Sequence, residues 1–252
     1  MKRRGMVSLN GKLSMVTGAA GVLGRALTEA LVADGLRVLM ADVNAEGLEE
    51  AAQGFGGRAI PLVLDVSDPA AVADVAEQVS RTHGVVEVLI NNAGILSNNK
   101  SAETTPEEWR RLMAVNLDGA FYLSRTFLPA MKKGGWGRIV NVCSLAMKTG
   151  GLTAGTAYTA SKGGLAALTL SLARESAADG VTVNGVAPAY IRTPMVTEQL
   201  SQDQRRRLLA QIPVGRFCEA AEVAHLVRFL VAPLSGFITG EIVDINGGLH
   251  LD

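Results

Sequence analysis

The segment YTASK contains a tyrosine and a lysine that could carry out acid/base chemistry together. Tyr158 and Lys162 are four residues apart in a stretch with helical periodicity, so both side chains are expected on one helix face, one turn apart. Free tyrosine has a pKa of about 10, but a neighbouring ammonium group favours the phenolate and lowers that pKa. The pair could therefore exchange a proton near neutral pH, although Tyr and Lys at this spacing more often lie on an ordinary solvated helix face.

A glycine-rich stretch, TGAAGVLG at residues 17–24, could hold a phosphate. Gly18, Gly21 and the backbone near Leu23 lie where an apolar run ends and a helical pattern begins. Glycines there let a pyrophosphate approach the backbone, and the amino end of a helix favours an anion. The same residues would also suit a tight turn that only packs a helix against a strand.

Asp42 ends the next apolar run, 24 residues after Gly18. A carboxylate at that position would accept hydrogen bonds from the hydroxyls of an adenosine ribose and repel a 2′-phosphate. Arg25 is expected inside the first helix and is discounted as a phosphate ligand. We therefore predict NAD as the cofactor, with NADP less favoured, although Asp42 could also cap the following helix.

Apolar or β-branched runs alternate with helical patterns along the whole chain. The runs that are typical of buried parallel strands cover residues 13–17, 36–41, 59–64, 86–91, 137–142, 180–186 and 241–245. The helical patterns cover residues 22–34, 45–53, 69–82, 106–131, 156–178 and 220–231. This alternation predicts an α/β fold, a Rossmann-type doubly wound seven-stranded parallel sheet with helices on both faces. Ligands of such sheets bind beyond the carboxyl ends of the strands.

No linker, repeat or low-complexity segment divides this pattern, so we expect a single catalytic domain over residues 1–252. The connection at about 192–217 is long and charged. It is expected to be a lid or substrate loop with a helix of its own.

The composition argues against several classes of function. There are 24 basic and 24 acidic residues, so no bulk charge would attract nucleic acid or an anionic membrane. Cys143 and Cys218 are too few for a disulfide framework and match no zinc spacing; His83 and His225 are unmatched by other ligands, so no metal site is expected. The basic start of the chain lacks the apolar segment of a signal peptide, and no run approaches membrane-spanning length. We expect a cytoplasmic protein.

Several motifs, in order along the chain, resemble those of the short-chain dehydrogenase/reductase family. They are TGAAGVLG, NNAG at 91–94, Asn116 in AVNLDGA, Ser144 in GRIVNVCS, Tyr158 and Lys162 in YTASK, and VAPAYIRTPM at 186–195. The resemblance extends from Lys12 to the ITGEIVDINGG segment near the carboxyl end.

The resemblance implies a role for each residue of the motif set. Tyr158 would be the general acid/base, and Lys162 would hold the nicotinamide ribose and depress the pKa of the tyrosine. Ser144 would hydrogen-bond to the substrate oxygen. Asn116 would support a water that links Lys162 to solvent.

Cofactor contacts are also implied at the ends of three further strands. Asn92, Ala93 and Gly94 would line the adenine ribose and pyrophosphate, Asp65 and Val66 would flank the adenine, and Ile191 and Thr193 would meet the nicotinamide carboxamide. A simple turn, a helix cap and a loop residue before a proline are the competing interpretations of these three groups.

Three departures from the family pattern stand out. Val22 occupies the usual position of the middle glycine, with Gly21 one step early, and we predict that its side chain turns away into the packing of the first helix. The stretch from Ser144 to Tyr158 is about one residue longer than usual and could shape a different pocket. Ala189 replaces a common glycine and adds a methyl group near the nicotinamide.

The resulting hypothesis is an NAD(H)-dependent oxidoreductase that transfers a hydride between nicotinamide and a small secondary alcohol or ketone, such as a polyol, sugar or hydroxy acid. The alternative is a 3-oxoacyl-[acyl-carrier-protein] reductase using NADPH. Asp179 would repel an acidic carrier, an effect that Lys132, Lys133 and Arg138 partly offset. A non-catalytic NAD-binding scaffold is less favoured, because the motif set is intact. The resemblance further implies a homotetramer.

Overall fold

A seven-stranded parallel sheet forms the centre of the fold. The computed structural model describes residues 8–193 and 201–251. The strands are β1 (Leu13–Thr17), β2 (Arg37–Asp42), β3 (Ala59–Val63), β4 (Val86–Asn91), β5 (Gly137–Val142), β6 (Val181–Pro188) and β7 (Ile242–Ile245). They pair in the order β3-β2-β1-β4-β5-β6-β7, and every pair is parallel. The predicted Rossmann-type sheet is confirmed.

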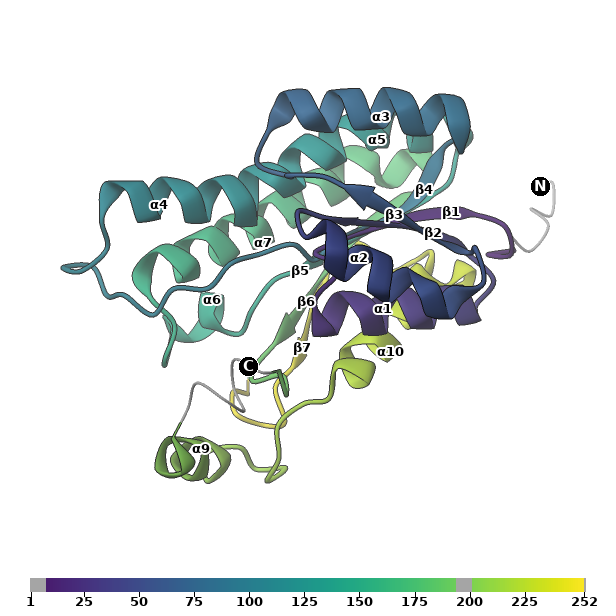
Figure 1. The fold of residues 1–252 in the computed structure, drawn as a ribbon. Coiled ribbons are helices and arrows are strands. Elements are labelled where there is room, and N and C mark those ends of the chain that lie inside the picture. Colours follow the sequence, from purple (N-terminus) through teal and green to yellow (C-terminus); the bar gives the residue numbers. More distant parts are fainter. Residues whose placement is uncertain (1–7, 194–200, 252) are drawn as a thin grey trace.

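Helices cover both faces of this sheet. They are α1 (Val22–Ala33), α2 (Ala45–Ala52), α3 (Pro69–Thr82), α4 (Pro106–Met113), α5 (Gly119–Gly134), α6 (Ala146–Thr149), α7 (Thr156–Ser176), α9 (Gln202–Leu209) and α10 (Ala220–Val231). Helices α3, α5 and α7 lie on one face, and α1, α2 and α10 lie on the other (Figure 1).

Successive side chains of each strand enter different hydrophobic layers. On β2, Val38 and Met40 pack with the layer of α1 and α10, whereas Leu39 packs with the layer of α3, α5 and α7. Because both faces are buried, the strands need apolar residues at consecutive positions rather than at alternate ones. This explains the continuous apolar runs in the sequence.

The order of the strands places a ligand crevice at the carboxyl ends of β1 and β4. β1 lies between β2 and β4, so the chain builds the sheet in one direction up to β3 and then returns to continue it on the other side. At such a reversal the connections leave in opposite directions and open a crevice between them. The glycine-rich turn after β1 and the NNAG segment at the end of β4 both lie there.

The helix expected over residues 106–131 is interrupted and longer than predicted. It begins after Thr105, whose side chain caps it, and α4 is followed by a wide π-helical turn, η2 (Ala114–Asp118), before α5 continues to Gly134. Asn116 lies in this turn and forms hydrogen bonds to the backbone of Ile95. The turn therefore contains a predicted site residue. Helical periodicity alone could not predict it, because the turn depends on contacts with another segment.

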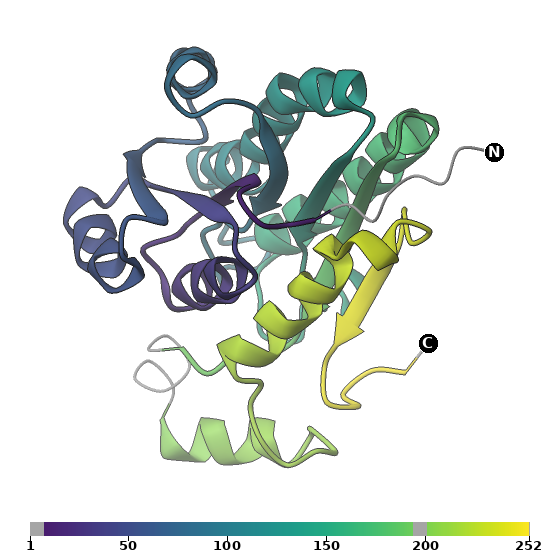
Figure 2. The ribbon, with the colours of Figure 1, turned by 90° about the vertical axis from the view of Figure 1, so that its right-hand side faces the viewer.

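The segment expected to form a lid contains helix α9, as predicted. Figure 2 shows α9 set apart from the layers around the sheet. Residues 194–200 of this segment, and residues 1–7 of the basic start of the chain, lie outside the described residues. Among the helices of residues 8–193 and 201–251, none combines the length and apolar character needed to cross a bilayer.

Candidate active site

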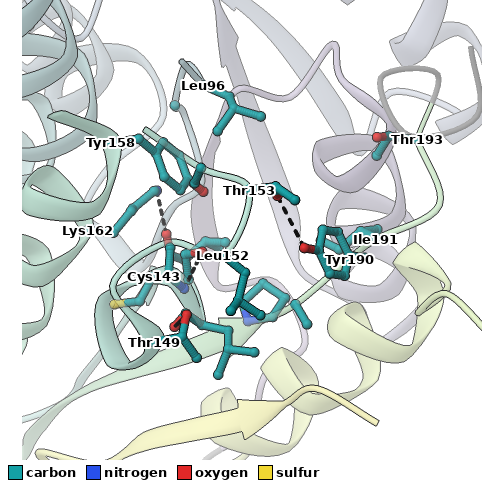
Figure 3. A pocket seen from close by; sticks show the side chains of 18 of the residues that line it. Leu96, Cys143, Thr149, Leu152, Thr153, Tyr158, Lys162, Tyr190, Ile191 and Thr193 are labelled. Atoms are coloured by element: carbon teal, nitrogen blue, oxygen red, sulfur yellow. Dashed lines mark hydrogen bonds between the residues drawn. The ribbon is translucent and has the colours of Figure 1, made fainter. Parts of the chain in front are cut away.

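Tyr158 and Lys162 lie in the first turns of α7, on the same wall of a cavity at the carboxyl end of the sheet (Figure 3). The lysine Nζ is 5.9 Å from the centre of the tyrosine ring and donates a hydrogen bond of 2.7 Å to the carbonyl oxygen of Val142. Lys162 is almost fully buried at 3% exposure. The helical spacing thus produces the expected pair, held against the end of β5.

Burial controls the proton affinity of both groups. It raises the pKa of Tyr158 above its ordinary value of 10, and a hydrogen bond with Ser144 opposes this only in part. It also lowers the pKa of Lys162 to about 8. The expected depression of the tyrosine pKa by the lysine is therefore wrong for this structure, because loss of hydration of the phenolate outweighs the other effects. Tyr158 holds its proton at neutral pH.

Ser144 follows β5 after Cys143 and lines the same cavity as Tyr158. Its hydroxyl accepts a hydrogen bond from the amide of Ala146 at 3.2 Å, which begins the short helix α6. Two hydroxyls, from Ser144 and Tyr158, thus face one volume from different elements. This arrangement can hold a carbonyl or alcohol oxygen between two hydrogen-bonding groups.

Cys143, next to the serine, is buried, and burial raises the pKa of its thiol to about 11. The thiol is therefore protonated and unreactive, in agreement with its expected role as a buried strand residue.

Asn116 joins the loop after β4 to helix α7. Its Nδ2 donates to the carbonyl oxygen of Ile95 and to the hydroxyl of Ser161, both at 3.0 Å, and its Oδ1 accepts from the amide of Ile95 at 2.8 Å. A Cβ built on Gly94 would lie 3.3 Å from Asn116 Oδ1 and 3.4 Å from Lys162 Nζ. Asn116 and Lys162 therefore flank the same glycine, although Asn116 itself does not line the cavity.

The structure requires glycine at some positions of the turn after β1 but not at all of them. Gly18 has a positive φ of 64°, and a Cβ there would lie 3.0 Å from the Cα of Ala93. A Cβ on Gly24 would collide with the carbonyl of Gly18. Gly21 is unlike both, because its Cβ would meet only the Gly18 oxygen at 3.5 Å, an ordinary contact. The packing of the chain therefore requires Gly18 and Gly24 but leaves the space at Gly21 open.

The sequence led us to expect that Val22 packs into the first helix, and this prediction is wrong. It is the first residue of α1 and is 42% exposed, whereas the next residue, Leu23, packs against the core and lines the cavity. The first position of a helix projects beyond the layer that the helix covers. Val22 is also not among the residues that line the cavity.

Asp42 ties the end of β2 to the glycine-rich turn. Its Oδ2 accepts from the amide of Ala20 and its Oδ1 from the amide of Asn44, both at 3.0 Å. Asn44, not Asp42, caps helix α2 by accepting from the amide of Gly47. The capping interpretation of Asp42 is therefore wrong.

The side chain of Arg25, which we did not expect to act as a phosphate ligand, contacts the same glycine-rich turn. Its Nε donates to the carbonyl oxygen of Ala20 at 2.9 Å, and an Nη donates to that of Gly47 at 3.4 Å. It also forms an exposed ion pair with Glu50 at 3.4 Å. Arg25 lies inside the first helix, as expected, and its side chain is long enough to fold back over the turn.

The remaining predicted cofactor residues lie at the same edge of the sheet but not all in the cavity. Asn92, Gly94, Ile191 and Thr193 line it together with Leu23. Asp65 is exposed and accepts from the amide and hydroxyl of Ser67 at 2.9 and 2.6 Å. The other predicted residues outside the cavity are Gly18, Gly21, Asp42, Val66 and Ala93.

Comparison with known proteins places this geometry in a family. A family model described as enoyl-(acyl carrier protein) reductase matches residues 18–250. The 3-oxoacyl-[acyl-carrier-protein] reductase FabG of Salmonella typhimurium is 40% identical over 246 residues, which cover 97% of this chain and 100% of the relative. FabG of Escherichia coli is 39% identical with the same coverage. A crystal structure of a short-chain dehydrogenase/reductase from Brucella melitensis, described as a glucose/ribitol dehydrogenase, matches with a TM-score of 0.90 and 32% identity over 97% of this chain and 99% of that one.

The chain belongs to the short-chain dehydrogenase/reductase family. It is therefore an oxidoreductase of a family that uses a nicotinamide cofactor. The resemblance inferred from the motifs is confirmed.

The residues present in this short-chain dehydrogenase/reductase fit such a cofactor. Helix α1 begins at Val22, and Gly21 before it provides no side-chain cap; Leu23 of the first turn lines the cavity. Uncapped amides at a helix start, next to a glycine that the packing does not require, are suited to a pyrophosphate. The cofactor would supply the hydride, and the surrounding side chains would supply binding and proton transfer.

Two cavity residues, Leu96 and Leu249, had no signal in the sequence motifs and come from segments far apart in the chain. Thr149, Thr153 and Ala154 also line the cavity, and they belong to the stretch between Ser144 and Tyr158 that was expected to shape a pocket.

The sequence also led us to expect five residues near the pocket, which are Leu145, Met147, Lys148, Leu152 and Tyr190. Of these, Leu145, Leu152 and Tyr190 line it. Met147 instead packs beside α7, and Lys148 forms an ion pair of 2.9 Å with Asp244 of β7.

Proposed function

We propose that this protein is a nicotinamide-dependent reductase of 3-oxoacyl thioesters. The observation that carries the proposal is that the side chains of Tyr158 and Ser144 line one largely apolar cavity, in which burial raises the pKa of the Tyr158 phenol. Reduction of a ketone requires a proton donor at the carbonyl oxygen, and the raised pKa of Tyr158 keeps that donor loaded. The FabG relatives, named as 3-oxoacyl reductases, support this substrate class.

Each residue of the site has a proposed task in this reaction. Tyr158 donates its proton to the substrate oxygen, and the Ser144 hydroxyl holds that oxygen and stabilises the charge that develops on it. Lys162 binds the ribose next to the nicotinamide and, when charged, favours loss of the Tyr158 proton in the transition state. Asn116 holds the turn beside Gly94 and supports a path by which a proton can return to Lys162 from solvent.

The cavity has the size and character for a short acyl chain. Its volume is about 290 Å³, and Leu96, Leu145 and Leu152 contribute apolar surface. Tyr190 and Thr153 add hydroxyls on the wall opposite Tyr158, 3.2 Å apart (Figure 3). Ala189 also lines the cavity, so the methyl group that replaces the usual glycine narrows it.

The proposal includes NADH as the preferred cofactor. The Asp42 carboxylate beside the glycine-rich turn supports binding of an unphosphorylated ribose, and Arg25 is already occupied by Ala20, Gly47 and Glu50. We expect kcat/KM to favour NADH over NADPH about tenfold, or about 1.4 kcal/mol of transition-state discrimination. In the variant Asp42→Ala this preference should fall towards unity. Equal use of both cofactors by the unaltered protein would contradict the proposed role of Asp42.

A second candidate is an NAD-linked dehydrogenase of a secondary alcohol such as a polyol, sugar or hydroxy acid. The surface near the end of α7 favours it over a reaction that needs an acidic carrier protein. Lys132, expected to attract a carrier, is paired with Asp179 at 3.2 Å and Glu175 at 3.7 Å, and Arg138 is buried. Of the three cations expected to offset Asp179, Lys133 remains exposed.

One assay separates the two candidates. Purified protein is incubated with NADH and 3-oxobutanoyl N-acetylcysteamine thioester, and in parallel with NAD and a panel of polyols, sugars and hydroxy acids, while NADH absorbance is followed. We expect oxidation of NADH by the thioester. Turnover of a polyol or hydroxy acid with no thioester reduction would overturn the main proposal in favour of the second candidate.

The proposal extends to the organisation of the chain. Residues 1–252 would act as one catalytic domain, with 192–217 as a lid over the cavity, in a homotetramer. A cytoplasmic location is supported by Cys143 and Cys218, which are free thiols.

A further inference from the structure

A second hollow lies beside helix α9, outside the active-site cavity. Its lining includes four arginines, Arg192, Arg205, Arg206 and Arg216, and no acidic residue of the described part of the chain. We refer to it as the arginine hollow. A concave surface of guanidinium groups without carboxylates is suited to an anion such as a phosphate.

Three of these arginines are held by carboxylates that lie outside the hollow. Arg192 pairs with Glu219 at 2.7 Å, Arg206 with Asp203 at 3.1 Å and Arg216 with Glu222 at 2.6 Å. Arg216 uses two of its nitrogens on Glu222 and is therefore largely occupied, and this contact lowers the pKa of Glu222 to about 2. Each of these three guanidinium groups therefore already has a carboxylate partner.

Arg205 differs from the other three. Among residues 8–193 and 201–251 it forms no ion pair, and its Nε is buried without a hydrogen-bond partner. A buried donor that lacks an acceptor destabilises the state that contains it, and an anion in the hollow would provide the acceptor. Arg205 is therefore the centre of the candidate site, with Arg192 beside it.

The arginine hollow shares a wall with the active site. Phe217 lines the hollow and packs edge-on against Tyr190, which lines the cavity, with ring centres 6.3 Å apart. The segments that carry them are joined by hydrogen bonds from Cys218 to the carbonyl of Tyr190 and from Arg192 to that of Cys218, at 2.9 and 2.8 Å. Arg192 lines the hollow while its neighbour Ile191 lines the cavity, so one extended segment serves both.

We propose that the arginine hollow binds the phosphate of the phosphopantetheine arm on which the acyl group is carried. The choice of this anion rests on the proposed 3-oxoacyl reductase function, because a thioester in the cavity must extend its arm past the cavity wall. Coenzyme A and a carrier protein share this arm, and both present its phosphate. The hollow thus offers the substrate a binding surface that does not depend on Lys132 and its neighbours.

Calorimetry on the full chain tests the anion site directly, with 4′-phosphopantetheine and pantetheine as probes. We expect the phosphorylated probe to bind more tightly, and the variant Arg205→Gln to weaken its binding about tenfold. The matched control is Arg207→Gln, which removes the same charge from the same helix at an exposed position that does not line the hollow. Equal binding of the two probes, or equal losses in the two variants, would overturn the proposal.

Kinetic measurements then show whether the phosphate comes from coenzyme A or from a carrier protein. They also distinguish failure of the proposed reductase function from failure of the proposed anion site. The same 3-oxoacyl group is presented on N-acetylcysteamine, on coenzyme A and on an acyl carrier protein. For each variant, kcat/KM for coenzyme A and for the acyl carrier protein is divided by kcat/KM for the N-acetylcysteamine thioester. This ratio should fall about tenfold for both carriers in Arg205→Gln and should not change in Arg207→Gln. If the ratio falls for coenzyme A alone, the arginine hollow acts on the nucleotide of coenzyme A. That result would overturn the proposal that the hollow binds the phosphate of the shared arm. Failure to reduce any thioester would remove the proposed function, whereas the calorimetry would still decide whether the hollow binds phosphate.

Discussion

Tyr158 is the residue to which we assign proton transfer in the reaction. Its burial stabilises the phenol relative to the phenolate, and Tyr158 lines the same cavity as Ser144. A loaded proton donor suits reduction of a carbonyl, whereas oxidation of an alcohol would first require loss of this proton.

Replacing Tyr158 by Phe should therefore abolish turnover and spare cofactor binding. We expect kcat to fall about a thousandfold, because the proton donor is lost while the ring and its packing remain. Fluorescence titration with NADH should give an unchanged Kd. Tyr122→Phe, a change of the same kind on α5 outside the cavity, is the control. Turnover that survives in Tyr158→Phe would refute the assigned mechanism.

The pH dependence of reduction should follow Lys162. Burial lowers the pKa of Lys162 to about 8, and the raised pKa of Tyr158 keeps the phenol protonated throughout the neutral range. Since the charged form of Lys162 is the one that assists proton transfer, its loss with rising pH should lower the rate. We expect kcat/KM for reduction to decline above pH about 8, measured at saturating NADH. A profile that stays level to pH 9.5 would contradict this role.

At the scale of elements, the loop at residues 150–155 forms a wall of the active site and is held from outside it. Lys100 Nζ donates to the carbonyl oxygens of Gly151 and Ala154, at 3.0 and 2.7 Å. Between these two anchors the loop carries Leu152 and Thr153 into the cavity lining. We therefore predict that Lys100 positions the substrate rather than the cofactor.

The variant Lys100→Met should raise the KM for the ketone substrate about fivefold, because a loosened wall places the substrate less accurately. The KM for NADH should not change, since no cofactor residue is touched. Lys133→Met, at an exposed position of α5, serves as the control. Steady-state kinetics with each substrate varied in turn would measure both constants, and parallel increases in the two KM values would argue against a local effect.

At the scale of the whole molecule, apolar side chains are exposed on two separate surfaces. One surface carries Phe229 of α10 together with Leu234 and Phe237, next to the edge strand β7. The other carries Phe121 of α5 and Leu170 of α7, on the opposite face of the sheet. Two distinct self-complementary interfaces generate a tetramer with dihedral symmetry, which is the assembly that we propose.

A charge introduced on one of these surfaces should therefore divide the tetramer into dimers. Phe237 is fully exposed in the isolated chain, so Phe237→Asp is not expected to disturb its folding. Light scattering coupled to size-exclusion chromatography should give half the mass of the unaltered protein. Val85→Asp, at an exposed apolar position that belongs to neither surface, should remain tetrameric. A monomer in the unaltered protein would contradict the proposed assembly.

Most of the fold could be predicted from local sequence patterns. The strand boundaries differ from expectation by at most two residues, because a strand buried on both faces needs a continuous apolar run that ends at turn residues. The π-helical turn at Asn116 was not predicted, because it depends on hydrogen bonds between Asn116 and the backbone of Ile95 in another segment. The orientation of Val22 was predicted wrongly, and the contacts of Arg25 with Ala20 and Gly47 were not foreseen, for a similar reason. A side chain near a helix start can project outward or fold back without any change in the pattern.

The sequence by itself determined the order of the elements, the family and the chemical groups available at the carboxyl ends of the strands. These depend on periodicity, turn residues and motif spacing, which are local. Only the tertiary structure decided that burial raises the pKa of Tyr158, that Lys100 anchors the loop at residues 150–155 and that Arg205 has a buried nitrogen without a partner. Those properties arise from burial and from contacts between distant segments, and neither can be computed from the residues along one stretch of chain.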